Sequence, residues 1–162
     1  MIQKVKSRKL NMPMLEIVIT LGILTIVSVF IMKLFLGANS LETKAKDISK
    51  ASILAQNIGE TIKAAESTEN AIKELGLIED TKQAGTYYQY YDSQWKPQEE
   101  PGVYSMTVTI SEEAYENAVL VTADIVVSKG KPYPIIKDDK EALAAITCKS
   151  YKQTTTSAVA TE

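Results

Sequence analysis

The chain has 162 residues, of which 45% are hydrophobic and 23% charged, a size that suits one modest domain and excludes two full-sized ones. With no histidine and a single cysteine, Cys148, it lacks the commonest general base and cannot form an internal disulfide or a thiolate metal cluster. A net charge of -2 gives no basic field for nucleic acid, and the seven glycines are scattered singly, without a phosphate-binding loop.

Residues 1–11 form a basic segment that precedes a long apolar run. The segment carries no acid and four positive side chains: Lys4, Lys6, Arg8 and Lys9. By the positive-inside rule, such a segment stays in the cytoplasm and the rest of the chain is exported. We therefore expect a single-pass membrane protein with a cytoplasmic N-terminus and its C-terminal part outside.

Residues 14–36 are long enough to cross a membrane as a helix. At 1.5 Å per residue they cover roughly 35 Å, against a hydrocarbon core of about 30 Å. Residues 17–32 carry no charge, and Lys33 can reach the outer interface through its apolar stem. Three interpretations are open: a cleavable secretory signal ending near Ala38, a plain signal anchor, and a helix in which Glu16 has a role.

Glu16 lies within the first turn or so of this apolar helix. A carboxylate costs about 2.5–3.5 kcal/mol at the bilayer centre and less near the interface, so it should be either peripheral or paired. A peripheral Glu16 would lie at headgroup level without a role. Because ionisable residues inside membranes are functional candidates by default, we take a paired Glu16 as the leading hypothesis.

Residues 9–24, Lys-Leu-Asn-Met-Pro-Met-Leu-Glu-Ile-Val-Ile-Thr-Leu-Gly-Ile-Leu, resemble the N-terminal processing signature of type IV pilins and of the pseudopilins of type II secretion and competence systems. In that family a basic leader ending in glycine is cleaved, and the mature chain has a glutamate at its fifth position. Aligned on Glu16, the resemblance implies cleavage between Asn11 and Met12, with Asn11 at the usual glycine position. If Asn11 blocks cleavage, the chain keeps its leader and is a pilin-like membrane anchor.

The resemblance also implies an assembly mechanism and a set of partners. It implies a prepilin peptidase, methylation of the new Met12 amine, other pilin or pseudopilin subunits, and an assembly ATPase with its inner-membrane platform. In an assembly, Glu16 of one copy would neutralise the Met12 ammonium of the next and so fix their axial stagger. Such pairing favours a helical assembly that does not close on itself.

The helical pattern continues beyond the membrane through residues 37–66. Apolar residues recur there at spacings of three and four: Leu41, Ala45, Ile48, Ala51, Ala55, Ile58, Ile62 and Ala65. We expect this stripe to pack on a globular part of the chain, in one helix from about residue 14 to residue 65. The alternative is two helices broken at residues 37–40, and Gly37 and Gly59 are candidate bends.

Residues 67–84 predict a short helix, at about residues 70–77, and a polar connection; residues 67–70 can cap the helix, and Gly76 helps to end it. Within residues 85–151, runs rich in tyrosine, threonine and valine favour strands at 86–92, 103–110, 118–127 and, more weakly, 144–151. Residues 95–102 and 128–134 are predicted as loops from their proline and glycine content, and consecutive strands joined in this way indicate an antiparallel meander. Residues 152–162 are rich in threonine and serine, and we expect them to be disordered.

These elements predict an α+β fold. Its long N-terminal helix is transmembrane over residues 12–36 and amphipathic over residues 37–66, and it packs on a small antiparallel sheet over residues 85–151. The resemblance implies the same pilin-like architecture.

Three features of the predicted head are candidate sites. An aromatic cluster could dock a carbohydrate or a protein: Tyr87, Tyr88, Tyr90, Tyr91 and Trp95. Strand alternation favours a different interpretation, in which one tyrosine of each pair faces the core and the other faces water. Cys148 is better explained as a buried small hydrophobe than as a reactive thiol. Residues 138–141, Asp-Asp-Lys-Glu, have too few oxygen ligands for a Ca²⁺ loop and fit a solvated charge run.

The sequence thus predicts a structural subunit, a minor pilin or pseudopilin of a pilus, competence or secretion filament, and not an enzyme. It predicts membrane lipid as a partner and no cofactor, metal or nucleic acid. The alternative from another class is a signal-anchored extracytoplasmic binding module that does not polymerise. A secreted enzyme is disfavoured because the chain shows no nucleophile and base pair.

Overall fold

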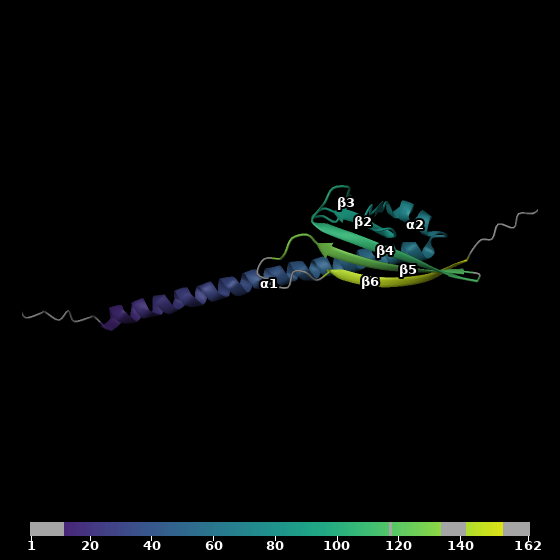
Figure 1. Cartoon of the computed structure of the whole chain (residues 1–162). Helices are drawn as coiled ribbons and strands as arrows, with labels where there is room; N and C mark the ends of the chain where they lie inside the picture. Colours follow the sequence, from purple (N-terminus) through teal and green to yellow (C-terminus); the bar gives the residue numbers. More distant parts are fainter. Residues whose placement is uncertain (1–11, 117, 134–141, 154–162) are drawn as a thin grey trace, which may run out of the picture.

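The computed structural model of the chain describes residues 12–116, 118–133 and 142–153, and it has the predicted α+β fold. A long helix, α1 (Met12–Ala64), extends away from a head that contains the last part of α1, a short helix α2 (Thr68–Leu75) and an antiparallel sheet (Figure 1). Every buried residue of α1 lies at Ser40 or beyond. We call residues 12–36 the membrane half of α1 and residues 37–64 its head half.

Helix α1 is continuous for 53 residues, a length of about 80 Å at 1.5 Å per residue. The alternative of two helices broken at residues 37–40 is therefore wrong. Pro13 lies in the first turn, where a missing N–H breaks no helical hydrogen bond. A Cβ added at Gly22 or Gly37 would have no neighbour within 4 Å from the rest of the fold, so neither glycine is required by close packing.

The sheet holds six strands, in the order β1-β2-β4-β5-β6, with β3 paired to β2, and every pair is antiparallel. The strands are β1 (Ile78–Glu79), β2 (Thr86–Tyr91), β3 (Pro97–Gln98), β4 (Tyr104–Tyr115), β5 (Ala118–Lys129) and β6 (Ala144–Gln153). The β4–β5 hairpin forms the centre of the sheet, and β6 forms one edge. The meander predicted from the sequence is confirmed.

Strands β4 and β5 are twelve residues each, longer than the sequence pattern predicts. Residues 111–116 are exposed and mostly polar, so they carry no alternation that could mark them as strand. The ladder itself extends them, as where Glu113 lies opposite Leu120. Strands β1 and β3 have two residues each, too few to give a periodic signal.

One face of the sheet packs against α1 and α2. Met106 and Val108 of β4 are fully buried, whereas Thr107 between them is only half-buried, which confirms the predicted alternation. The same core cluster includes Ile58 and Ile62 of α1. Alternate residues of β4 thus bury their side chains against the helices, as expected for a half-covered sheet.

The predicted apolar stripe of α1 is only in part the face that meets the sheet. Four members are buried: Ala51, Ala55, Ile58 and Ile62. Three members are exposed, so the prediction is wrong for them: Leu41, Ala45 and Ile48. At their level the face toward the head carries Ser40 and Asp47 instead, because the head meets α1 there with polar groups.

Helix α2 is capped at both ends, and α1 is capped at its C-terminal end. Ser67 caps α2 by accepting a hydrogen bond from the backbone N–H of Asn70 (3.2 Å), and Gly76 ends it with a left-handed backbone (φ 63°). The end of α1 is capped by Lys152 of β6, whose Nζ donates to the carbonyl oxygens of Ile62 (2.8 Å) and Lys63 (3.1 Å) and to that of Ala65. The carbonyls of Ile62 and Lys63, in the last turn of α1, have no partner within the helix and lie at the negative end of its dipole.

Strand β6 includes Lys152 and Gln153, the first two residues of the segment for which we expected disorder. Residues 154–162 lie outside the described part of the chain.

Candidate functional site

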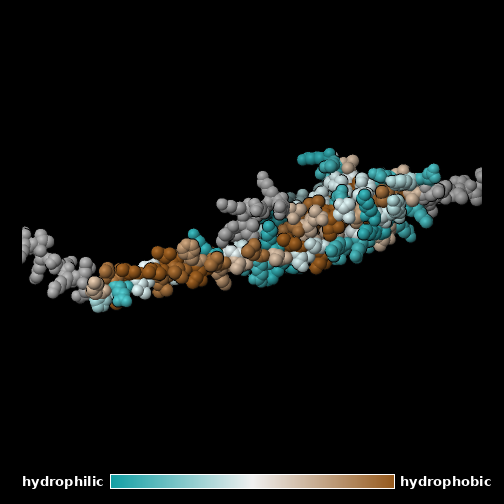
Figure 2. Space-filling view, turned by 90° about the horizontal axis from the view of Figure 1, so that it is seen from below, coloured by the Kyte–Doolittle hydropathy of each residue, from teal (hydrophilic) through white to brown (hydrophobic). Residues whose placement is uncertain are grey.

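The membrane half of α1 is a bare apolar surface. By length and composition, α1 is a helix that can cross a membrane, and none of its most apolar window is buried within the protein. Figure 2 shows hydrophobic side chains over most of this half and a mixture of hydrophobic and hydrophilic ones over the head. This distribution is what a segment solvated by lipid or by other apolar helices requires.

The hydroxyl groups of the membrane half are satisfied within the helix. Thr20, Thr25 and Ser28 each donate to the carbonyl oxygen four residues earlier, at 2.8 Å. Such bonds remove the cost of a free hydroxyl in hydrocarbon. The charged side chains of this half, Glu16 and Lys33, therefore remain as the groups that need an external partner.

Glu16 lies four residues after Met12, the first described residue of α1, which places them about 6 Å apart along the axis. Both side chains are exposed. Asn11 and the basic residues before it lie outside the described residues, so the predicted cleavage between Asn11 and Met12 stays a prediction. Met12 and Glu16 thus lie about one turn apart at the same uncovered end of α1.

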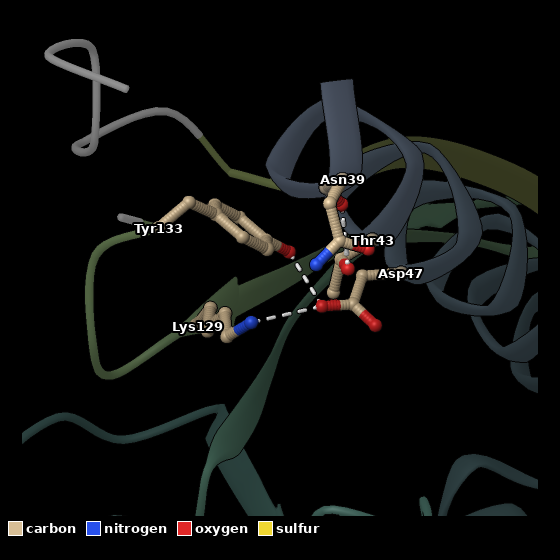
Figure 3. Close-up of polar contacts among 5 residues, drawn as sticks. All are labelled: Asn39, Thr43, Asp47, Lys129 and Tyr133. Carbon is tan, nitrogen blue, oxygen red and sulfur yellow. Dashed lines mark hydrogen bonds and ion pairs between the residues drawn. The ribbon is translucent and has the colours of Figure 1, made fainter. Parts of the chain in front are cut away.

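A second polar cluster joins α1 to the head, and Figure 3 shows its members. Asp47 of α1 accepts hydrogen bonds at its Oδ2 from the Tyr133 hydroxyl (2.6 Å) and from Lys129 Nζ (2.9 Å). The Lys129 ammonium also lies over the Tyr133 ring, 3.7 Å from its centroid, and 5.5 Å from that of Tyr104. Asp47, Lys129 and Tyr133 thus fasten the end of β5 to α1 just beyond the membrane half.

The environment of this cluster changes the ionisation of its members. Burial opposes the charged form of Asp47, but the hydrogen bonds from Tyr133, Lys129 and Tyr104 outweigh it, and the pKa of Asp47 lies below its ordinary value. Burial and the neighbouring Asp47 carboxylate raise the pKa of Tyr104. The cluster is therefore an ion pair at neutral pH, with the tyrosines as neutral hydrogen-bond donors.

Sequence reasoning missed the Asp47 cluster. Asp47 lies off the predicted apolar stripe, and Lys129 and Tyr133 belong to a segment predicted as a loop, 82 and 86 residues away along the chain. The one signal in the sequence is the helical spacing of Asp47, which stands four residues before the buried Ala51.

The aromatic cluster divides between two faces of the sheet, as strand alternation predicts. Tyr91 is buried, and Trp95 packs against the core and stacks on Tyr104 at 4.0 Å between ring centroids. Tyr88 and Tyr90 lie together on the other face, with their ring centroids 5.2 Å apart. Tyr87 also packs against the core. The five aromatic residues therefore divide between two separate surfaces and do not form one binding platform.

Trp95 is brought to this position by a tight turn. Asp92 accepts backbone hydrogen bonds at its Oδ1 from Gln94 and Lys96, and Trp95 adopts a positive φ of 65°, which is uncommon for a bulky side chain.

Cys148 is buried in β6, which confirms its interpretation as a small core residue. Burial also raises the pKa of its thiol and so disfavours the reactive thiolate. Residues 138–141, weighed as a Ca²⁺ loop, lie outside the described residues. Over residues 12–116, 118–133 and 142–153, no group of three or more acids and cysteines is placed to hold a metal ion.

Comparisons of the chain with protein-family models, with curated proteins and with solved structures find no match. A function for this chain has to be inferred from its own residues and geometry.

Proposed function

We propose that the chain is a structural subunit of a pilus-like, competence or secretion filament, a minor pilin or pseudopilin that assembles through the membrane half of α1. The observation that carries the proposal is the continuity of α1. One helix bears an uncovered apolar surface with an acid near its start and, without a break, enters the core of a folded head. Such a helix can be packed in a membrane or in a bundle of copies while the head stays outside.

The proposed assembly step is a charge pairing. Removal of residues 1–11 would leave an ammonium on Met12, and Glu16 of a neighbouring copy would neutralise it in the apolar bundle. The N-terminus lies in the cytoplasm before assembly, and the head lies outside. In this role the chain performs no chemistry on a substrate, and its partners are a prepilin peptidase, an assembly ATPase with its membrane platform, and other pilins.

A second function has one observation in its favour. Glu16 and Lys33 are separated by about 26 Å along α1, close to the thickness of a hydrocarbon core of about 30 Å. A lone copy could therefore place both charges at opposite interfaces and serve as an anchor for an extracytoplasmic binding module. This alternative needs neither cleavage nor a partner for Glu16.

Mass spectrometry of the N-terminus of the membrane form separates these functions. A chain that starts at Met12 supports the filament subunit, and a chain that starts at Met1 supports the anchor. A chain that starts at Asn39 would contradict both, because the apolar part of α1 would be removed as a secretory signal.

Glu16→Ala tests the pairing itself. We expect the variant to insert into the membrane and to fold its head normally, but to be lost from filaments. Glu60→Ala is the matched control, an exposed acid of α1 outside the membrane half, and it should be incorporated normally. Normal incorporation of Glu16→Ala would remove the basis of the proposal.

A further inference from the structure

Three apolar residues of α1 lie outside the face that packs on the head and do not belong to its core. Leu41 is 61% exposed and Ile48 is 38% exposed, and Ala45 between them is exposed as well. We call Leu41, Ala45 and Ile48 the outer stripe. Single exposed apolar residues are ordinary, but three at spacings of four and three form a continuous row on a helix.

The outer stripe lies on the same side of α1 as Glu16. At 3.6 residues per turn, Leu41, Ala45 and Ile48 all fall within about 40° of the direction of Glu16 around the helix axis. The residues that face the sheet, such as Asp47, Ala51 and Ile58, are centred about 120° from the direction of Glu16, a third of a turn away. The head thus leaves this helix face open over about 48 Å, from Glu16 to Ile48.

Lipid does not explain the outer stripe. Ile48 lies about 22 Å along the helix beyond Lys33, whereas the headgroup layer on each side of a bilayer is only about 5–8 Å thick. On one side, the exposed ion pair of Glu42 and Lys46 (2.7 Å) flanks the stripe. An apolar helix surface outside the membrane can instead be covered by a second apolar helix.

A second copy of the chain fits this surface when it is shifted by four residues. That shift, about 6 Å, is the one that brings the Met12 ammonium of one copy level with Glu16 of the next. It also sets large side chains against small ones: Leu41 lies level with Ala45 of the neighbour, and Ile48 lies level with its Ser52. An unshifted pair would instead oppose like residues, with Glu16 against Glu16 and Leu41 against Leu41.

We infer that the outer stripe is a docking surface for the same helix face of further copies of this chain, arranged in parallel and each advanced by four residues. The inference rests on the proposed filament function and extends its interface beyond the membrane half. Copies placed round a common axis with the stripe inward repeat the same contact indefinitely, because each contact is offset and the assembly does not close.

Cysteine cross-linking in membranes tests the offset on the full chain. Leu41→Cys combined with Ala45→Cys, treated with a short bifunctional thiol reagent, should give a ladder of covalent oligomers, because each copy presents one thiol to each neighbour. Ala45→Cys alone should give little product. The unmodified chain, whose Cys148 is buried, provides the background.

The control pair is Lys46→Cys with Lys50→Cys, which has the same spacing on another side of α1, where both side chains are exposed. An equal ladder from this pair, or no ladder from the stripe pair, would overturn the inference. Strong dimer formation by Ala45→Cys alone would also overturn it, because it would show an unshifted symmetric pair.

Polar substitution tests the apolar contact. Ile48→Ser should reduce incorporation into filaments about tenfold, from the loss of one buried apolar side chain per contact. Ile53→Ser is the matched control, since Ile53 is 55% exposed and lies roughly 140° from Ile48 around the axis. Equal incorporation of Ile48→Ser and the unmodified chain would contradict the docking surface. If Glu16→Ala still abolished assembly in that case, the proposed function would stand and only the outer stripe would fail.

Discussion

The two halves of α1 use similar apolar side chains in opposite environments. Ile26 in the membrane half is 60% exposed, whereas Ile62 in the head half is 2% exposed against the sheet. The head half finds its apolar partners within the same chain. The membrane half finds none among the described residues, so its surroundings must come from lipid or from other copies. The comparison shows that one unbroken helix can have its apolar contacts within the chain at one end and depend on an external partner for them at the other.

The largest expected effect separates the two halves directly. Ile62→Ala should lower the free energy of unfolding of the head by about 3–4 kcal/mol, because it opens a cavity in the core. Ile26→Ala should leave that free energy unchanged. Urea unfolding of the full chain in detergent, followed by the fluorescence of Trp95, measures both, because Trp95 stacks on Tyr104 inside the head. Equal losses would mean that the membrane half also supports the head.

The next effect concerns the attachment of β5 to α1. Asp47→Asn should lower the free energy of unfolding by about 2 kcal/mol, since the carboxylate accepts a charged hydrogen bond from Lys129 and a short one from Tyr133. The control is Glu42→Gln, which removes an exposed ion pair with Lys46 and should cause no measurable change. A silent Asp47→Asn would show that the head does not depend on this cluster.

The same cluster makes stability depend on pH. Because the folded-state pKa of Asp47 lies below its ordinary value of 3.8, its contribution is present above about pH 4 and is lost as pH falls through the lowered pKa. Tyr104 has a raised pKa, so its contribution is present below about pH 10 and is lost as pH rises. Urea midpoints measured against pH should show a weaker acid loss in Asp47→Asn than in the unmodified chain.

A smaller effect is expected where β6 caps α1. Lys152→Met should lower the free energy of unfolding by about 1 kcal/mol, because the last carbonyls of α1 lose a charged donor at the negative end of the helix dipole. Lys149→Met changes an exposed lysine of the same strand and should have no effect. Identical urea midpoints for the two variants would contradict the capping role of Lys152.

The smallest expected effect is a gain in the stability of the head. A Cβ added at Gly59 would lie 3.6 Å from Cys148 Sγ and from Ile125 Cδ1, an ordinary contact distance. Gly59→Ala should therefore raise the stability of the head by up to about 1 kcal/mol through its higher helix propensity. Gly37→Ala, with no such neighbour, tests the same propensity before the helix enters the core. A loss of stability in Gly59→Ala would show that the helix and β6 pack too closely for a methyl group.

Local patterns were sufficient to predict the fold. The apolar run predicted the membrane half, and the alternation of Met106, Thr107 and Val108 predicted which face of β4 is buried. These features repeat with the period of a helix or a strand, so neighbouring residues report on each other.

Contacts between distant parts of the chain were not predictable in this way. Asp47 with Lys129 and Tyr133, and Lys152 with the end of α1, join residues more than eighty positions apart. The outer stripe shows a related limit: Leu41 and Ile48 match the helical period of the core positions, but the head turns away from them. Periodicity identifies an apolar row and does not say which partner covers it.

The cap that Lys152 places on α1 has a consequence for how the chain matures. The first helix of the chain ends against its last strand, so β6 both covers the core side of α1 and completes the pairing of β5. If the chain is exported N-terminus first, as proposed, α1 enters the membrane before β6 crosses it. Until β6 is in place, the edge of β5 that it covers is unpaired and open to mispairing with other chains. Under the proposed export, the head can be completed only after β6 has crossed the membrane.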